Sequence, residues 1–279
     1  MTTFNPHMVA ITLLCALGFY GAFCFLRKRQ GKADELVNWS PLEAVGITVG
    51  LYFSTQIIAA LGLGAFGSLS GKTDTELTSL IEGSFPQFVY ILAVESLTIL
   101  LLHNFMVRRK TPWSAIGWVK PKLSDIVYAL AGFGAYFVLY AFIIAQLVHE
   151  FLPIDTEQQQ DLGFDKNVVG PELIFVFLSL VILPPLVEEI LVRGFLFTGL
   201  KNKMKLLPAM LITSVVFAAA HLQWGSDAPL LWTAAIDTFV LSLVLVYVRW
   251  RSKSLWPGIG IHFIKNGIAF LALFIFKVV

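Results

Sequence analysis

The chain has 279 residues, of which 57% are hydrophobic and only 14% are charged. Soluble domains typically have about 25% charged residues, so this composition excludes an ordinary soluble enzyme and predicts a single membrane domain over 1–279. The formal net charge of +2 gives no reason to expect nucleic acid as a partner. Cys15 and Cys24 are nine residues apart in one apolar run, a spacing that is poor for a disulfide on one helix.

Eight segments have the roughly 20 mostly apolar residues that a membrane-spanning helix needs. In chain order these segments are 8–26, 42–66, 86–106, 124–148, 171–199, 206–223, 230–249 and 255–276. The first lacks the basic start and small-residue cleavage site of a signal peptide, so we interpret it as a retained helix. The sequence therefore predicts an all-α polytopic fold of about eight transmembrane helices.

Basic residues gather in the loops on one side of the predicted bundle, after segments one, three, five and seven. Fifteen of the twenty are there: Arg27, Lys28, Arg29, Lys32, Arg108, Arg109, Lys110, Lys120, Lys122, Lys201, Lys203, Lys205, Arg249, Arg251 and Lys253. The opposite loops are mainly acidic. The positive-inside rule therefore places the basic loops in the cytoplasm and both termini outside. The short loops are typical of a bacterial plasma membrane protein.

Ionisable residues interrupt the predicted helices of the C-terminal half. An ionisable group at mid-bilayer costs about 2.5–3.5 kcal/mol on insertion scales, so each such group needs a partner or a function. Glu189 and Arg193 are four residues apart and share a helix face, which predicts an ion pair that supports the structure. Glu188 points about 100° away from Glu189 on an α-helix, and this carboxylate is left free to act.

Polar residues on two further helices lie at a similar depth. Phe217 and His221 share one helix face, and His262 and Asn266 share another. Glu188, His221 and Asn266 are each 13 residues from a marker of the cytoplasmic end, which places all three about 20 Å from that side. His262 is one turn shallower. We therefore predict one site that contains a carboxylate, two imidazoles and an amide.

These groups suit hydrolysis of an amide bond inside the membrane. A carboxylate held away from bulk water is a stronger base and can take a proton from a water molecule. One histidine can orient that water or carry the proton. A second histidine and an amide can donate hydrogen bonds to the oxyanion of a tetrahedral intermediate.

The sequence resembles the CPBP intramembrane proteases, which include the CAAX prenyl endopeptidase Rce1 and many bacterial Abi-type proteins. Three motifs carry the resemblance: EExxxR at Glu188, Glu189 and Arg193, FxxxH at Phe217 and His221, and HxxxN/D at His262 and Asn266. The stretch "RSKSLWPGIGIHFIKN" is similar to the family's approach to the third motif. The motifs place a catalytic core in 171–279, helices five to eight, whereas helices one to four in 1–150 have no signature.

The resemblance implies an Rce1-like bundle with a cytoplasm-facing cavity, in which a glutamate-activated water cleaves a peptide bond. It implies Glu188 and His221 as the acid/base pair, with His262 and Asn266 stabilising the oxyanion. The expected substrate is a membrane-associated protein or peptide, lipidated or not, and no catalytic metal is expected. Zinc is an alternative, because Glu188, His221 and His262 could supply the His₂Glu ligand set that zinc uses.

Two other classes of function fit the same polar residues. Buried charges also occur in transporters, although no repeat and no pair of broken helices is visible here. A non-catalytic scaffold or an immunity protein is the second alternative.

Four further polar residues in the predicted helices are interpreted as structural. Glu95 and His103 are eight residues apart on one face and can pair with other helices. Lys265 points away from the two motif residues of its own helix, and we expect it to pair with Asp237.

Overall fold

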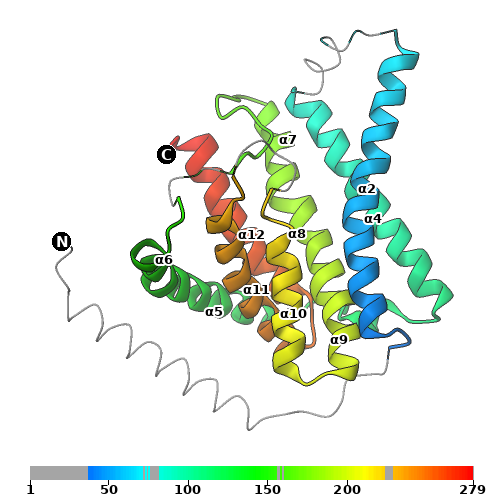
Figure 1. Cartoon of the computed structure of the whole chain (residues 1–279), viewed down its shortest axis with the longest axis vertical. Helices are drawn as coiled ribbons and strands as arrows, with labels where there is room; N and C mark the ends of the chain where they lie inside the picture. Colours follow the sequence, from blue (N-terminus) through cyan, green and yellow to red (C-terminus); the bar gives the residue numbers. More distant parts are fainter. Residues whose placement is uncertain are drawn as a thin grey trace.

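The computed structural model describes residues 37–71, 82–155, 160–223 and 229–278, together with 73, 75 and 158. Within these residues the fold is all-helical (Figure 1). The α-helices are α2 (Pro41–Leu69), α4 (Ser84–Arg108), α5 (Leu123–Leu139), α6 (Ala145–Phe151), α7 (Glu172–Phe177), α8 (Leu183–Glu188), α9 (Phe197–Lys203), α10 (Leu206–Ala219), α11 (Trp232–Ser252) and α12 (Trp256–Phe270). A 3₁₀ turn, η1 (Trp113–Ile116), and four π-helical segments, η2 (Tyr140–Ile144), η3 (Leu178–Ile182), η4 (Glu189–Leu196) and η5 (Leu271–Ile275), complete the described elements.

Six helices of the described part are long and apolar enough to cross a membrane. They are Pro41–Gly67, Ser84–Arg108, Leu123–Phe151, Glu172–Lys203, Trp232–Ser252 and Trp256–Ile275. A seventh, α10, has only 14 residues, about 21 Å of helix against a hydrocarbon core of about 30 Å. The predicted segment 8–26 lies outside the described residues, so the count of eight stays a prediction.

The helix over Glu172–Lys203 occupies the middle of the bundle. Every residue of η4 is buried, and so is the first turn of α9. In Figure 1, α2 and α4 lie on one side of this helix, and α5, α11 and α12 lie on the other. The main apolar core surrounds it, with Phe195, Leu196 and Leu200 at its centre. The run that follows Glu188, from Glu189 to Leu200, is therefore fully enclosed by the bundle.

Large apolar side chains remain exposed on the outer helices. On α2, α4 and α5 they include Phe53, Leu61, Val89, Leu100, Ile126 and Leu130. A soluble protein seldom exposes so many neighbouring apolar groups, whereas a lipid bilayer covers them. This pattern, together with the six long apolar helices, shows an integral membrane protein.

The start of α12 is held by contacts with the loop that connects α4 to α5. The backbone N–H of Leu255 donates to the carbonyl of Gly117 at 3.0 Å, and Trp256 Nε1 donates to the carbonyl of Val119 at 2.7 Å. The Trp118 and Trp256 rings pack together with their centroids 5.0 Å apart. These contacts set the depth and rotation of α12, which carries His262 and Asn266.

Candidate active site

Two consecutive prolines shape the helix that carries the glutamate doublet. Proline has no backbone N–H, so neither Pro184 nor Pro185 can donate to the carbonyl of Leu180, four and five residues earlier. Asn266 on α12 donates to this carbonyl instead, with 2.9 Å between Nδ2 and the oxygen. An interhelical bond thus replaces the missing helical one and joins α12 to the segment before the glutamates.

The predicted ion pair between Glu189 and Arg193 is confirmed. Arg193 Nη1 is 3.0 Å from Glu189 Oε1, and neither side chain has any exposed surface. The Arg193 guanidinium also lies over the Phe217 ring of α10, with Cζ 4.0 Å from the ring centroid. The other Glu189 oxygen lies against Gly258 of α12, close to where a Cβ would be. The pair is therefore held between α10 and α12, and a Cβ at residue 258 would require the Glu189 carboxylate or α12 to shift.

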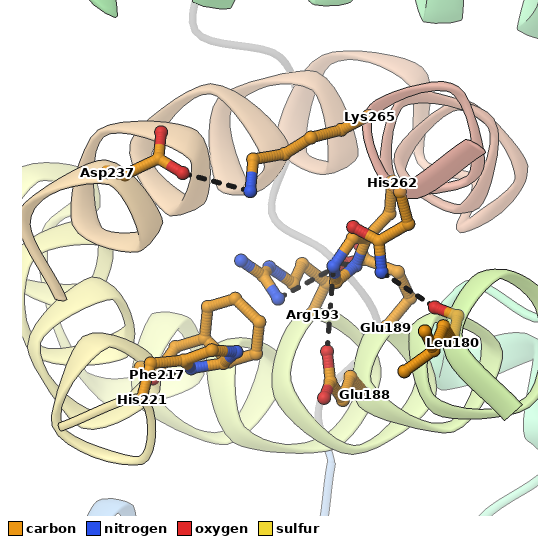
Figure 2. Close-up of polar contacts among 10 residues, drawn as sticks. Leu180, Glu188, Glu189, Arg193, Phe217, His221, Asp237, His262 and Lys265 are labelled. Carbon is orange, nitrogen blue, oxygen red and sulfur yellow. Dashed lines mark hydrogen bonds and ion pairs between the residues drawn. The ribbon is translucent and has the colours of Figure 1, made fainter. Parts of the chain in front are cut away.

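His262 lies between the two glutamates (Figure 2). Its Nε2 is 3.7 Å from Glu188 Oε2, and its Nδ1 is 3.6 Å from Glu189 Oε1. Both distances are longer than a hydrogen bond, so the His262 ring lies beside both carboxylates and is bonded to neither. The Glu188 side chain is 28% exposed, whereas Glu189 has no exposed surface. Glu188 is thus the member of the doublet that a substrate or a water molecule can reach.

His221 follows the end of α10 and shares an aromatic neighbour with His262. Its Nδ1 is 2.9 Å from the carbonyl oxygen of Phe217. Because a carbonyl only accepts, Nδ1 carries the proton in this contact and Nε2 is the basic nitrogen. The Phe217 ring lies 4.7 Å from the His221 ring and 6.1 Å from the His262 ring, centroid to centroid. Tyr52 of α2 donates to the carbonyl of Ala220 at 3.0 Å and holds this helix end in place.

The predicted pair of Lys265 and Asp237 is also confirmed. Lys265 Nζ is 2.9 Å from Asp237 Oδ2, and the Tyr136 hydroxyl donates to the other oxygen of the same carboxylate. The Tyr140 ring stacks on that of Tyr136. This network joins α5, α11 and α12 on the side of the cluster away from Glu188 in Figure 2. It gives two mid-membrane charges a partner each, which agrees with a structural role.

Glu95 and His103 both lie on α4, and their surroundings differ. Trp113 Nε1 donates to His103 Nδ1 at 3.2 Å, and the two rings stack with centroids 5.9 Å apart. Glu95 lines a groove between α4 and α8 and lies within electrostatic range of Glu188. The N-terminal helices, which have no sequence motif, thus contribute an acidic group close to the doublet.

The structure brings the three motifs together, with one change in register. The sequence places Asn266 at the depth of Glu188, whereas His262, one turn away on the same helix, is the residue that faces Glu188. A π-helical turn contains more residues than an α-helical turn, so η4 is shorter than its residue count suggests and Glu188 lies less deep. Sequence reasoning also missed the interactions of Leu180 and Gly258, because each involves a helix distant in the sequence.

The possible zinc ligands do not form a metal site in this arrangement. Across the described residues, no group of three or more His, Cys, Asp or Glu side chains is placed to hold a metal ion. His221 Nδ1 is directed at a backbone carbonyl, and both nitrogens of His262 face glutamate oxygens.

The fold and the buried cluster define an integral membrane protein with a glutamate and a histidine facing each other inside a helical bundle. Comparison with known families identifies it more closely. Residues 170–268 match the family model of the type II CAAX prenyl endopeptidase Rce1-like proteins. Over these residues the chain is similar to the Rce1-like family, as the motifs predicted.

A further comparison extends beyond the family model. A protein from Escherichia coli, described as an uncharacterized 24.3 kDa protein, is 26% identical over 219 residues. The matched region covers 76% of this chain and 91% of that protein, so the similarity extends to the N-terminal helices. No solved structure matches.

Proposed function

We propose that this chain is an intramembrane endopeptidase in which Glu188 activates a water molecule to cleave a peptide bond. The observation that carries the proposal is the division of the doublet. Glu189 is fully buried and paired with Arg193, whereas Glu188 is partly exposed and faces His262 at 3.7 Å. A carboxylate that is held away from bulk water, reachable and unpaired with a guanidinium has the properties of a general base.

The proposed reaction is an addition followed by an elimination. Glu188 removes a proton from water, and the water oxygen bonds to the carbonyl carbon of the scissile peptide. The resulting tetrahedral intermediate carries its negative charge on the former carbonyl oxygen. When the C–N bond breaks, the leaving nitrogen takes up the proton that Glu188 removed from water, directly or relayed through His221 Nε2, which leaves a carboxylic acid and an amine as products.

The oxyanion is assigned to donors on α12. Asn266 has two amide N–H groups, and one of them donates to Leu180, so the other remains for the intermediate. His262 can donate from Nε2, which lies on the Glu188 side of the ring. The buried ion pair of Glu189 and Arg193 packs against the Nδ1 side of His262, with 3.6 Å between Nδ1 and Glu189 Oε1, and limits how the ring can turn. Here Glu189 is a positioning residue.

The substrate class follows from the family and from the surroundings of the site. The family description names CAAX prenyl endopeptidases. The site lies among helices that expose apolar side chains to lipid. We therefore expect a membrane-associated protein or peptide, with lipidation decided by experiment.

The test is comparative membrane proteomics of cells that express the wild type, Glu188→Gln or Glu172→Gln. Glu172 is an exposed glutamate at the start of α7 and gives the matched loss of one negative charge. Peptide ends that require the enzyme should disappear in Glu188→Gln and persist in Glu172→Gln, with equal amounts of folded protein. Unchanged ends in Glu188→Gln, together with an effect of deleting the whole chain, would instead favour the scaffold or transporter alternatives.

A further inference from the structure

The last turn of α10 leads directly into His221, and its carbonyl groups need hydrogen-bond donors. The final carbonyls of an α-helix have no partner within the helix. His221 itself supplies two donors: its backbone N–H donates to the Ala218 carbonyl at 3.0 Å, and its Nδ1 donates to the Phe217 carbonyl at 2.9 Å. The Ala220 carbonyl accepts from outside the helix, from the Tyr52 hydroxyl at 3.0 Å. This end of α10 thus depends on α2 for one of its bonds.

The Tyr52 bond acts on the peptide unit that joins Ala220 to His221. A peptide unit is planar, so its carbonyl and its N–H turn together. In this unit the carbonyl is held by Tyr52 and the N–H by the carbonyl of Ala218. Both sides of the plane are therefore fixed, and with them the position of the His221 Cα from which the imidazole extends. Without the hydroxyl of Tyr52, only one side would remain held.

The position of Tyr52 is set by the way in which α2 is attached to the bundle. Just before α2, Trp39 stacks on Phe195 of η4, with the ring centroids 4.8 Å apart. From there α2 packs along η4 and α9. Tyr52 reaches the end of α10 and also lies within electrostatic range of Glu188. A residue of the N-terminal helices, which have no sequence motif, is thus placed between the proposed base and His221.

We propose that Tyr52 is a positioning residue for the proposed reaction, whose hydroxyl aligns His221 so that Nδ1 keeps its proton and Nε2 stays free to receive one from Glu188. This inference rests on the proposed endopeptidase function. A neutral imidazole carries one ring proton, so a ring with its proton on Nε2 cannot accept another there. Chains in which the end of α10 is released from Tyr52 therefore lose part of the proton relay.

The first measurement needs no substrate. Full-length protein labelled with ¹⁵N-histidine is studied in lipid bilayers by solid-state NMR at about pH 8, where an ordinary histidine is neutral. The His221 signals are assigned by their loss in His221→Ala. In the wild type the ring proton of His221 should be on Nδ1. In Tyr52→Phe, which removes only the hydroxyl, a measurable share of the His221 rings should carry the proton on Nε2.

Tyr90→Phe is the matched control. Tyr90 is half-buried like Tyr52, and its hydroxyl also donates to a backbone carbonyl of a neighbouring helix, that of Gln56 on α2, at 3.4 Å. The control therefore removes the same kind of bond near the start of α4, without changing the donor to Ala220. The His221 signals should be the same in Tyr90→Phe as in the wild type.

The second measurement is kinetic and uses a synthetic peptide copied from one Glu188-dependent cleavage site, with the full-length enzyme in lipid nanodiscs. A hydrogen bond between neutral groups corresponds to about two- to tenfold in an equilibrium constant. Tyr52→Phe should therefore lower kcat by about two- to tenfold. KM should change little, because Tyr52 acts through His221 and not on the substrate. Tyr90→Phe should leave both constants unchanged.

The outcomes separate this proposal from the function on which it rests. If no cut depends on Glu188, the endopeptidase function fails and the kinetic role of Tyr52 fails with it. If cuts depend on Glu188 but Tyr52→Phe keeps both the His221 signals and kcat of the wild type, only the role of Tyr52 is overturned. A change in one of these two readouts without the other also overturns it, because the proposal requires the ring proton and the rate to respond together.

Discussion

Replacing Glu189 by glutamine should cost stability, although the substitution keeps the size of the side chain. Glu189 and Arg193 have no exposed surface and are 3.0 Å apart, so the substitution leaves a guanidinium buried without its counter-ion. Removing one partner of a buried ion pair typically costs about 3–5 kcal/mol. In a domain of this size, a loss of 1 kcal/mol in the free energy of unfolding lowers the midpoint of thermal unfolding by about 2–4 °C. The midpoint of Glu189→Gln should therefore fall by roughly 6–20 °C.

The measurement is thermal unfolding of purified protein, followed by tryptophan fluorescence, for the wild type, Glu188→Gln and Glu189→Gln. Glu188→Gln is the matched control, because it makes the same chemical change one residue away on a side chain that is 28% exposed. Its unfolding midpoint should move much less. The double variant Glu189→Leu with Arg193→Met removes both charges and should recover most of the loss, since no unpaired charge remains.

Gly258→Ala approaches the same carboxylate without changing a charge. The added Cβ would collide with a Glu189 oxygen and force the pair or α12 to move, so this variant should also be destabilised. The reasoning would be refuted by a Glu189→Gln protein whose midpoint stays within about 2 °C of the wild type, or by a larger loss in Glu188→Gln.

Asn266→Ala should lower kcat by about 10²–10³-fold with little change in KM, as for the loss of an oxyanion donor. It also leaves the Leu180 carbonyl unpaired, so adding Pro184→Ala, which restores a helical N–H, should recover stability but not activity. Purified active protein should contain no stoichiometric zinc by elemental analysis, and one zinc per chain that is lost with His221→Ala would replace the glutamate-water mechanism. Single cysteines at 201–205 should react with reagents from the cytoplasmic side and those at 149–155 from the outside. The same side for both would break the proposed topology.

The sequence by itself determined the membrane class and the approximate helix bounds, because both depend on local hydrophobicity. The predicted segments 86–106 and 255–276 differ from Ser84–Arg108 and Trp256–Ile275 by one or two residues at each end. It also determined the pair of Glu189 and Arg193, since two residues four apart on one helix must be neighbours whatever surrounds them. The resemblance to the Rce1-like family likewise came from motif order and spacing.

Only the tertiary structure decided which residues of different helices meet. His262 rather than Asn266 faces Glu188, because the depth of a residue depends on π-helical turns that a uniform rise per residue ignores. The two prolines in the sequence predict that the Leu180 carbonyl lacks a helical donor. The rotation of α12 decides that Asn266 is the residue that donates to this carbonyl. Glu95 is close to Glu188 because α4 packs on α8, and helix packing is set by side-chain surfaces that are far apart in the sequence.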